Sequence, residues 1–309
     1  MHSHDHAHDH HGHGHSHAPA SFGVAFAVGI VLNLGFVVVG ATAGVIGHSM
    51  ALIADAGHNL GDVLGLAVAW TAAMLARRAP SSRFTYGLRS SSILAALFNA
   101  VFLLIATGAI ALEAILRFGD PQPVAGRLVM LVAAIGIAIN AATAMLFLRG
   151  RHDDLNIRGA FLHMAGDAAV SAGVVLAGVA IVFTGRNWID PAVSLLVCFA
   201  IVAGTWNLLR DALRMTLHGV PPGIDPVKVS AFLAQCPGVC AIHDLHIWPM
   251  STTETALTAH LVILDGHPGD AVLHGIADEL RHHYGIAHAT LQVETDANAD
   301  CALADAHVV

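Results

Sequence analysis

Two segments of the chain each carry a histidine and an aspartate at the same spacing, inside an otherwise hydrophobic stretch. The pairs are His58 with Asp62 and His163 with Asp167. Residues four apart lie on one face of a helix, so each pair presents an imidazole nitrogen and a carboxylate oxygen to one small ion. Two such helices that face each other supply an N2O2 ligand set, which suits a tetrahedral divalent ion such as zinc.

Ionisable groups inside a hydrophobic helix are energetically costly, so they face a bundle interior or a water-filled path. For one pair alone, a buried histidine that hydrogen-bonds a carboxylate one turn away is an equally good explanation. The identical spacing on two helices favours metal binding. Asp55 precedes His58 by three residues and lies on a neighbouring face, so we interpret it as a supporting or capping group rather than a ligand.

The composition is that of an integral membrane protein. Of the 309 residues, 55% are hydrophobic and 12% are charged, and no basic patch with interleaved aromatic residues indicates nucleic acid as a partner. Arginines gather between the second and third spans, between the fourth and fifth, and after the sixth, so both termini are expected in the cytoplasm. Six spans, each near the ~20 residues that cross a bilayer, are predicted at residues 22–47, 50–75, 91–118, 124–148, 157–184 and 189–209.

After the sixth span the pattern becomes that of a small soluble domain. Alternating and helical periodicities predict a helix, two strands, a helix and a strand, in the order αββαβ, which suits a compact α+β sandwich. The predicted organisation is a disordered His-rich cytoplasmic tail, a six-helix transmembrane domain, a small cytoplasmic domain and a disordered tail, at residues 1–20, 21–210, 211–296 and 297–309.

Histidines are concentrated at the start of the sequence, whereas the cysteines are few and irregularly spaced. The first residues, MHSHDHAHDHHGHGHSH, are expected to bind zinc, nickel or copper loosely, or to form a solvated tail with incidental affinity. Four cysteines at irregular positions define no disulfide framework. Cys236 and Cys240 are separated by three residues rather than the two of a zinc knuckle, so they are interpreted as packing residues.

Several motifs resemble one family across nearly the whole chain. They are HSMALIADAGHNLGDVLGL, RFTYGLRSSSILAALFNA, LNIRGAFLHMAGDAAVSAGVV, WIDPAVSLLV and HDLHIWPMSTTETALTAHL. On these motifs the chain is identified as a member of the cation diffusion facilitator family, in its bacterial zinc, cadmium and cobalt exporting branch. The resemblance implies a homodimer in the bacterial inner membrane, with six spans and a ferredoxin-like cytoplasmic domain. It also implies that the protein is not an enzyme but an antiporter, which exports zinc in exchange for protons by alternating access.

Carried over position by position, the resemblance assigns two sets of metal ligands. The transport site falls on His58, Asp62, His163 and Asp167, and a histidine at the first of these positions implies a tendency toward zinc. A second site, which would bind regulatory metal within or between protomers, falls on His243, His260, His274 and Glu294. Surface or packed histidines are the alternative there, and His246 fits a packed strand residue equally well. Residues 77–89 contain neither aspartate nor histidine, so a metal site in that loop is not expected.

Two other classes of function are compatible with buried histidine and aspartate. A membrane metalloenzyme would need a general base, but the sequence has no HExxH motif and no glutamate beside either pair. A metal sensor or buffer would not require six spans with ligands in two of them. An antiporter fits the ligand chemistry, because metal binding requires neutral imidazole and ionised carboxylate, so protons and metal compete for the same atoms.

Overall fold

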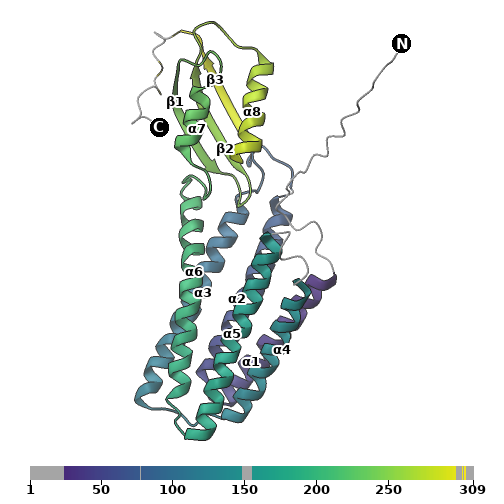
Figure 1. The fold of residues 1–309 in the computed structure, drawn as a ribbon, viewed down its shortest axis with the longest axis vertical. Coiled ribbons are helices and arrows are strands. Elements are labelled where there is room, and N and C mark those ends of the chain that lie inside the picture. Colours follow the sequence, from purple (N-terminus) through teal and green to yellow (C-terminus); the bar gives the residue numbers. More distant parts are fainter. Residues whose placement is uncertain (1–23, 77, 148–154, 297–300, 302, 304–309) are drawn as a thin grey trace, which may run out of the picture.

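A bundle of six long helices is joined to a small domain of three strands and two helices (Figure 1). The computed structural model describes residues 24–76, 78–147, 155–296, 301 and 303, so the His-rich tail lies outside the described residues. We call the end of the bundle next to the small domain the proximal end, and the opposite end the distal end. The bundle helices are α1 Val24–Ile46, α2 Met50–Ala76, α3 Ser91–Gly119, α4 Gly126–Phe147, α5 Leu155–Thr184 and α6 Ile189–Thr216.

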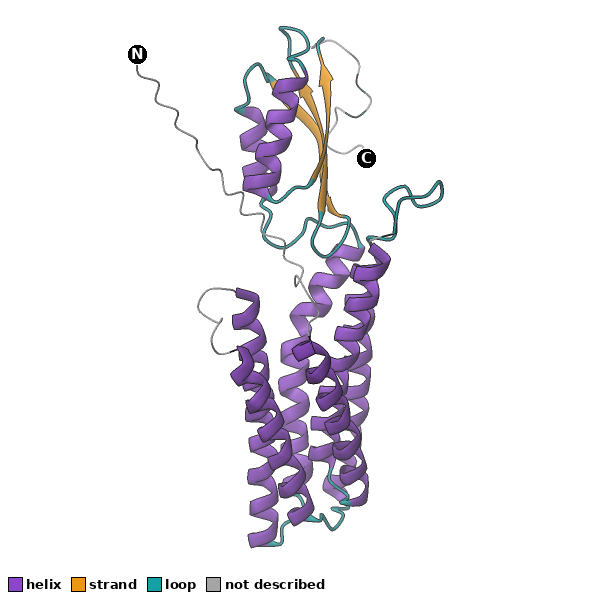
Figure 2. Cartoon of the chain, turned by 90° about the vertical axis from the view of Figure 1, so that its right-hand side faces the viewer, coloured by secondary structure: helices purple, strands orange, loops and turns teal. Residues whose placement is uncertain are grey.

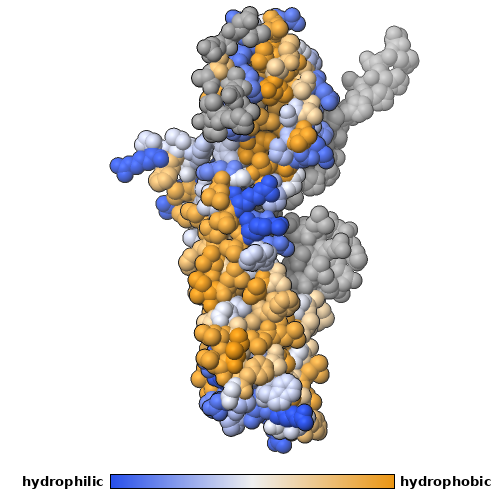
Figure 3. Space-filling view, turned by 90° about the vertical axis from the view of Figure 1, so that its left-hand side faces the viewer, coloured by the Kyte–Doolittle hydropathy of each residue, from blue (hydrophilic) through white to orange (hydrophobic). Residues whose placement is uncertain are grey.

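The outside of the bundle is hydrophobic. Leu176, Phe183 and Phe199 are each more than two-thirds exposed, and such side chains dominate the bundle surface in Figure 3. Exposure of so large an apolar surface to water is unfavourable, whereas contact of that surface with lipid is not. Over the described residues, four segments are long and apolar enough to cross a membrane, namely Ser91–Gly119, Gly126–Met145, Met164–Thr184 and Ile189–Thr216.

Close helix contacts divide the bundle into groups. The pair α4 and α5 and the pair α3 and α6 pack most extensively, while α2 packs mainly on α1 and α3. A Cβ atom on Gly61 of α2 would lie 2.6 Å from Leu103 of α3, so the absence of a side chain lets these helices approach. Toward the proximal end, α4 and α5 lean away from the other helices (Figure 2).

Helix α6 continues beyond its hydrophobic part. It ends at Thr216 rather than at the predicted Leu209, because the backbone hydrogen bonds of a helix continue through Arg210 and Arg214 as readily as through apolar residues. The predicted boundary between residues 210 and 211 therefore falls inside a helix. The small domain follows after a short linker.

The small domain has the predicted αββαβ order. Its elements are α7 Pro226–Ala234, β1 Ala241–Pro249, β2 Thr255–Val262, α8 Asp270–Tyr284 and β3 His288–Glu294. The sheet has the order β1-β2-β3, with β1 antiparallel and β3 parallel to β2. Leu257, Ala259 and Leu261 alternate along β2 and pack against Leu233 of α7 and Leu280 of α8. Both helices cover the same face of the sheet (Figure 2), so the opposite face is left for other contacts.

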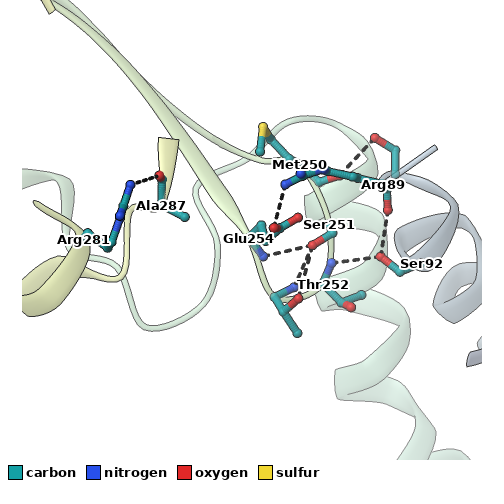
Figure 4. A network of polar contacts seen from close by, with 10 residues as sticks. Arg89, Ser92, Met250, Ser251, Thr252, Glu254, Arg281 and Ala287 are labelled. Carbon is teal, nitrogen blue, oxygen red and sulfur yellow. Dashed lines mark hydrogen bonds and ion pairs between the residues drawn. The ribbon is translucent and has the colours of Figure 1, made fainter. Parts of the chain in front are cut away.

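The loop between β1 and β2 contacts the start of α3 (Figure 4). The Arg89 Nη1 atom lies 2.6 Å from the Glu254 Oε1 atom. The Ser90 hydroxyl donates to the Met250 carbonyl at 3.2 Å, and the Thr252 amide donates to the Ser92 hydroxyl at 3.0 Å. One ion pair and two hydrogen bonds thus connect the small domain to a bundle helix.

Candidate metal sites

The first candidate site lies between α2 and α5, inside the bundle. His58, Asp62 and Asp167 each offer one ligand atom, and these atoms lie within 4.8 Å of one another. The His58 Nε2 atom is 3.0 Å from Asp167 Oδ1 and 3.7 Å from Asp62 Oδ2. Asp167 is buried, while His58 and Asp62 are partly buried. The structure therefore brings together three of the four residues predicted for the transport site.

The fourth predicted residue, His163, belongs to α5, but its side chain lies outside those that the structure describes. Its position is one turn before Asp167, on the same face of the helix. The backbone of α5 is therefore compatible with the predicted ligand set.

Asp55 lies beside this site without joining the described group. Its carboxylate accepts a hydrogen bond from the Ser171 hydroxyl of α5, at 3.3 Å to Oδ2. Its backbone carbonyl accepts a hydrogen bond from the side-chain amide of Asn59 at 2.8 Å. Asp55 therefore connects α2 to α5 near the ligands, in agreement with its interpretation as a supporting group.

The second candidate site lies on the sheet face opposite α7 and α8. His243, His260, Glu294 and Cys301 each offer one atom, and all four atoms lie within 4.8 Å of one another. The His260 Nδ1 atom is 2.9 Å from Glu294 Oε1, 3.2 Å from His243 Nε2 and 3.6 Å from the Cys301 Sγ atom. Imidazole nitrogen, carboxylate oxygen and cysteine sulfur are the ligand types that zinc binds in four-coordinate sites, so these four residues could hold one zinc ion.

Strand pairing explains why three of these residues meet. His243 of β1 lies directly opposite His260 of β2, and Glu294 of β3 lies opposite Val262, two residues further along β2. Side chains two residues apart in a strand share one face of the sheet. Cys301 comes from beyond the last strand, in a segment for which we predicted disorder. In the sequence, the only indication that Cys301 could be a ligand is that cysteine, like the three strand residues, is a type that binds zinc.

Two other histidines of the small domain lie elsewhere. His274, which was predicted as a ligand, is exposed on α8, and the structure does not place it with the described members of the second site. A role for His274 between protomers stays a prediction. His246 pairs with the Asp244 carboxylate at 2.7 Å, and it is likewise absent from this group.

The carboxylate of Glu294 is held in its ionised form. Burial raises the pKa of Glu294, but the hydrogen bond from Cys301 and the charges and hydrogen bond of His243 and His260 outweigh burial, so the pKa lies below its ordinary value. An ionised carboxylate is the form that binds a metal ion.

A hydrophobic helix bundle with histidine and carboxylate groups in its interior, joined to a small α+β domain with a second such cluster, defines a membrane protein that handles metal ions. Residues 26–217 match the model of the cation efflux transmembrane domain. Residues 221–296 match the cytoplasmic, dimer-type domain of cation efflux proteins. The chain belongs to the cation efflux family, whose members are membrane transporters and not enzymes.

Relatives from several bacteria resemble the chain over most of its length. Zinc transporter ZitB of Escherichia coli is 36% identical over 85% of this chain and 84% of its own. Metal cation efflux system protein CzcD of Cupriavidus metallidurans is 35% identical over 88% and 85%. The cadmium, cobalt and zinc/H(+)-K(+) antiporter of Bacillus subtilis is 34% identical over 87% and 88%. The solved metal-bound C-terminal domain of CzcD is 33% identical and covers 23% of this chain and 99% of its own, with a TM-score of 0.22.

Proposed function

We propose that this protein exports zinc, and also cadmium or cobalt, from the bacterial cytoplasm in exchange for protons. The relatives' names state zinc, cadmium and cobalt as their ions, and one name states an exchange with protons and potassium ions. In this proposal the protein lies in the inner membrane as a homodimer, with the proximal end of the bundle and both termini in the cytoplasm. The transported ion binds to His58, Asp62, His163 and Asp167 on α2 and α5.

The convergence of His58, Asp62 and Asp167 is the observation that carries the proposal. The 3.0 Å contact between His58 Nε2 and Asp167 Oδ1 has the length of a hydrogen bond that shares one proton between the two groups. A metal ion at the same place would need both atoms as ligands, without that proton. Proton and metal therefore exclude each other here, which is the requirement for antiport.

The packing of the bundle supports alternating access. The two halves of the site belong to different groups, because α2 packs mainly on α1 and α3 while α5 packs mainly on α4. At the proximal end α4 and α5 lean away from the other helices (Figure 2). A small relative movement of these groups changes the side from which the ligands are reached.

In the same proposal, His243, His260 and Glu294 form a regulatory metal site in the cytoplasmic domain, with Cys301 as a further ligand. Four ligands from these residues would fill the coordination of a tetrahedral zinc ion and leave no open position for chemistry. Such closed sites stabilise a conformation rather than catalyse a reaction. Zinc is therefore both the transported substrate and the regulatory ligand.

The test is zinc uptake into proteoliposomes with an imposed pH gradient, with internal zinc and internal pH recorded together. The wild type is expected to move zinc in one direction and protons in the other. The variant Asp167→Asn removes a carboxylate from the site and is expected to reduce both fluxes to background while it still folds as a dimer. Asp265→Asn, at an exposed aspartate of the cytoplasmic domain, is the matched control and should transport normally.

Two results would contradict the proposal. Zinc movement by Asp167→Asn at the wild-type rate would remove the transport site from α2 and α5. Zinc binding by the wild type without any flux would indicate a sensor rather than a transporter.

A further inference from the structure

The first turn of α2 is capped by a side chain of another helix. The first amides of a helix have no partner within it and must be satisfied from outside. The amides of Met50 and Ala51 donate to the Asp190 carboxylate of α6, at 2.6 and 3.4 Å. The next amide, of Leu52, donates to the hydroxyl of Ser49 at 3.2 Å, and that hydroxyl donates in turn to Asp190 at 2.5 Å.

This cap is shielded from solvent. Asp190 is 1% exposed, and Ser49, Met50 and Ala51 are each at most 3% exposed. A buried carboxylate is costly unless its hydrogen-bond capacity is met. Here three donors and the positive end of the α2 dipole stabilise the charge. The cap is therefore an interaction between one specific carboxyl side chain and one helix terminus, in which protein groups provide the hydrogen bonds.

Neighbouring contacts connect the residues just before α2 to two further helices. The Gly47 carbonyl accepts a hydrogen bond from the Ala125 amide, just before α4, at 3.0 Å. The His48 carbonyl accepts a hydrogen bond from Arg117 Nη1, near the end of α3, at 2.9 Å. Asp190 adds the connection to α6, so the distal end of α2 is bonded to three other helices.

The capped end determines where the metal ligands of α2 lie. His58 is about 12 Å and Asp62 about 18 Å along the axis from the first residue of α2, at about 1.5 Å per residue. Leu52, Ala54 and Ala56, which lie between, are buried. A continuous, packed helix transmits a shift or rotation of its first turn to His58 and Asp62. Their fit to Asp167 on α5 therefore depends on the position of that turn.

We propose that Asp190 is a positioning residue of the transport site, which sets the height and rotation of α2 so that His58 and Asp62 meet Asp167. This inference rests on the proposed transport function, because it assumes that these three residues bind the transported ion. A purely structural cap would affect only the stability of the fold. The two roles differ in their effect on metal affinity per folded molecule.

The experiment compares Asp190→Ala and Asp190→Asn with the wild type in the full-length protein. Zinc affinity is measured in proteins that also carry His243→Ala and His260→Ala, so that the cytoplasmic cluster does not compete for zinc, whereas the transport rate is measured without these two substitutions. Asp120→Ala, at an exposed aspartate of the distal end, is the matched control. Three quantities are measured per folded dimer, namely zinc affinity, transport rate at saturating zinc, and hydrogen exchange of the amides of residues 50–62.

For Asp190→Ala we expect faster exchange at residues 50–52 and an affinity for zinc about tenfold lower, equivalent to about 1.4 kcal/mol. The rate at saturating zinc should stay within about twofold, because the ligands themselves are intact. Asp190→Asn keeps one acceptor oxygen and should restore part of the affinity. This milder variant also supplies the comparison if Asp190→Ala does not fold.

Unchanged affinity in both variants, together with faster exchange, would reduce Asp190 to a structural cap and overturn the inference. Unchanged exchange would overturn it as well, because the cap would then not hold α2. If the wild type bound zinc but moved none, the transport function would fail, while the affinities of the variants would still decide the role of Asp190.

Discussion

At the scale of single residues, Asp244 orients His260 in the cytoplasmic cluster. Its Oδ2 atom lies 3.4 Å from His260 Nε2, while the Nδ1 atom of the same ring faces Glu294 and Cys301. A carboxylate behind a ligating imidazole fixes the ring and its tautomer, so that the other nitrogen keeps its lone pair for metal. Asp244 reaches this place with a φ of 52°, at an irregularity between His243 and His246 in the pairing of β1 with β2. This left-handed conformation costs of order 1–3 kcal/mol for a residue other than glycine.

Replacement of Cys301 by serine should weaken zinc binding to the cytoplasmic cluster by at least about tenfold. Serine keeps the size of the side chain but does not provide a thiolate, which is a much better zinc ligand than a hydroxyl. The measurement is a zinc titration of the full-length protein with Asp62→Ala, which disables the transport site. Cys240→Ser, at an exposed cysteine outside the cluster, should bind normally. Equal affinity of the Cys301→Ser variant and the wild type would remove Cys301 from the ligand set.

Cys236 and Cys240 should differ strongly in alkylation. Burial in the core of the cytoplasmic domain raises the pKa of the Cys236 thiol, so less of it is in the reactive thiolate form at pH 8. Cys240 is exposed. We expect iodoacetamide at pH 8 to modify Cys240 and to leave Cys236 unmodified until denaturant is added, as read by mass spectrometry of peptides. Equal modification in the folded protein would contradict the interpretation of Cys236 as a packing residue.

At the scale of elements, glycines set how closely helices approach. Gly126 of α4 and Gly178 of α5 face each other, and a Cβ atom on either would lie 3.1 Å from the carbonyl oxygen of the other. Backbone atoms cannot rotate away as a side chain does. The closest part of the α4–α5 pair therefore depends on both residues, and these helices carry one half of the proposed transport site.

Gly178→Val should separate α4 from α5 and destabilise the bundle by roughly 1–3 kcal/mol, as overpacking of a close contact does. Gly173→Val provides the control, because a Cβ atom at Gly173 of the same helix meets nothing within 4 Å. The measurement is the midpoint of thermal unfolding in detergent, which should fall for Gly178→Val and change little for Gly173→Val. Equal midpoints for both variants would show that the contact between the glycines does not limit the packing.

Hydropathy and periodicity predicted the six helices and the αββαβ order, because these patterns depend on local sequence. They did not predict the end of α6 at Thr216, where apolar character ceases before the helix does. They also gave no indication that Asp190 caps α2, because that contact joins residues 140 positions apart. The spacing of His58 and Asp62 identified a ligand pair within one helix. Cys301 reaches its cluster through a contact 41 residues away along the chain, which no local pattern contains.

At the scale of the whole molecule, several contacts among the described residues join the cytoplasmic domain to the bundle, among them the edge-on contact of Tyr86, before α3, with His288 of β3. Two further connections are the linker after α6 and the contact of the β1–β2 loop with the start of α3 (Figure 4). The loop contact is specific, since Arg89 and Glu254 form a charge-assisted pair at 2.6 Å. Helix α3 packs on α2, where Gly61 adjoins Leu103. A change in the sheet can therefore reach the helix that carries His58 and Asp62.

The Arg89–Glu254 pair should couple metal binding in the cytoplasmic domain to transport while contributing little to stability. Both side chains are 37% exposed, and ion pairs of this exposure contribute about 0–1 kcal/mol. In the proposed mechanism, His243→Ala disables the regulatory site and slows zinc uptake by proteoliposomes. We expect this effect to disappear when Glu254→Gln is already present, because the ion pair that connects the β1–β2 loop to the start of α3 is then absent. This non-additivity is what a double-mutant cycle measures.

Glu279→Gln is the matched control for that cycle. Glu279 also forms an ion pair, with His283 of the same helix, and Glu279 itself is not among the described residues that line the cavity between the domain and the bundle. His243→Ala should slow transport equally in the Glu279→Gln variant and in the wild type. If Glu254→Gln left the effect of His243→Ala unchanged, the signal would have to travel through another connection, such as the linker after α6 or the contact of Tyr86 with His288. In that case the loop contact would only hold the domain in place.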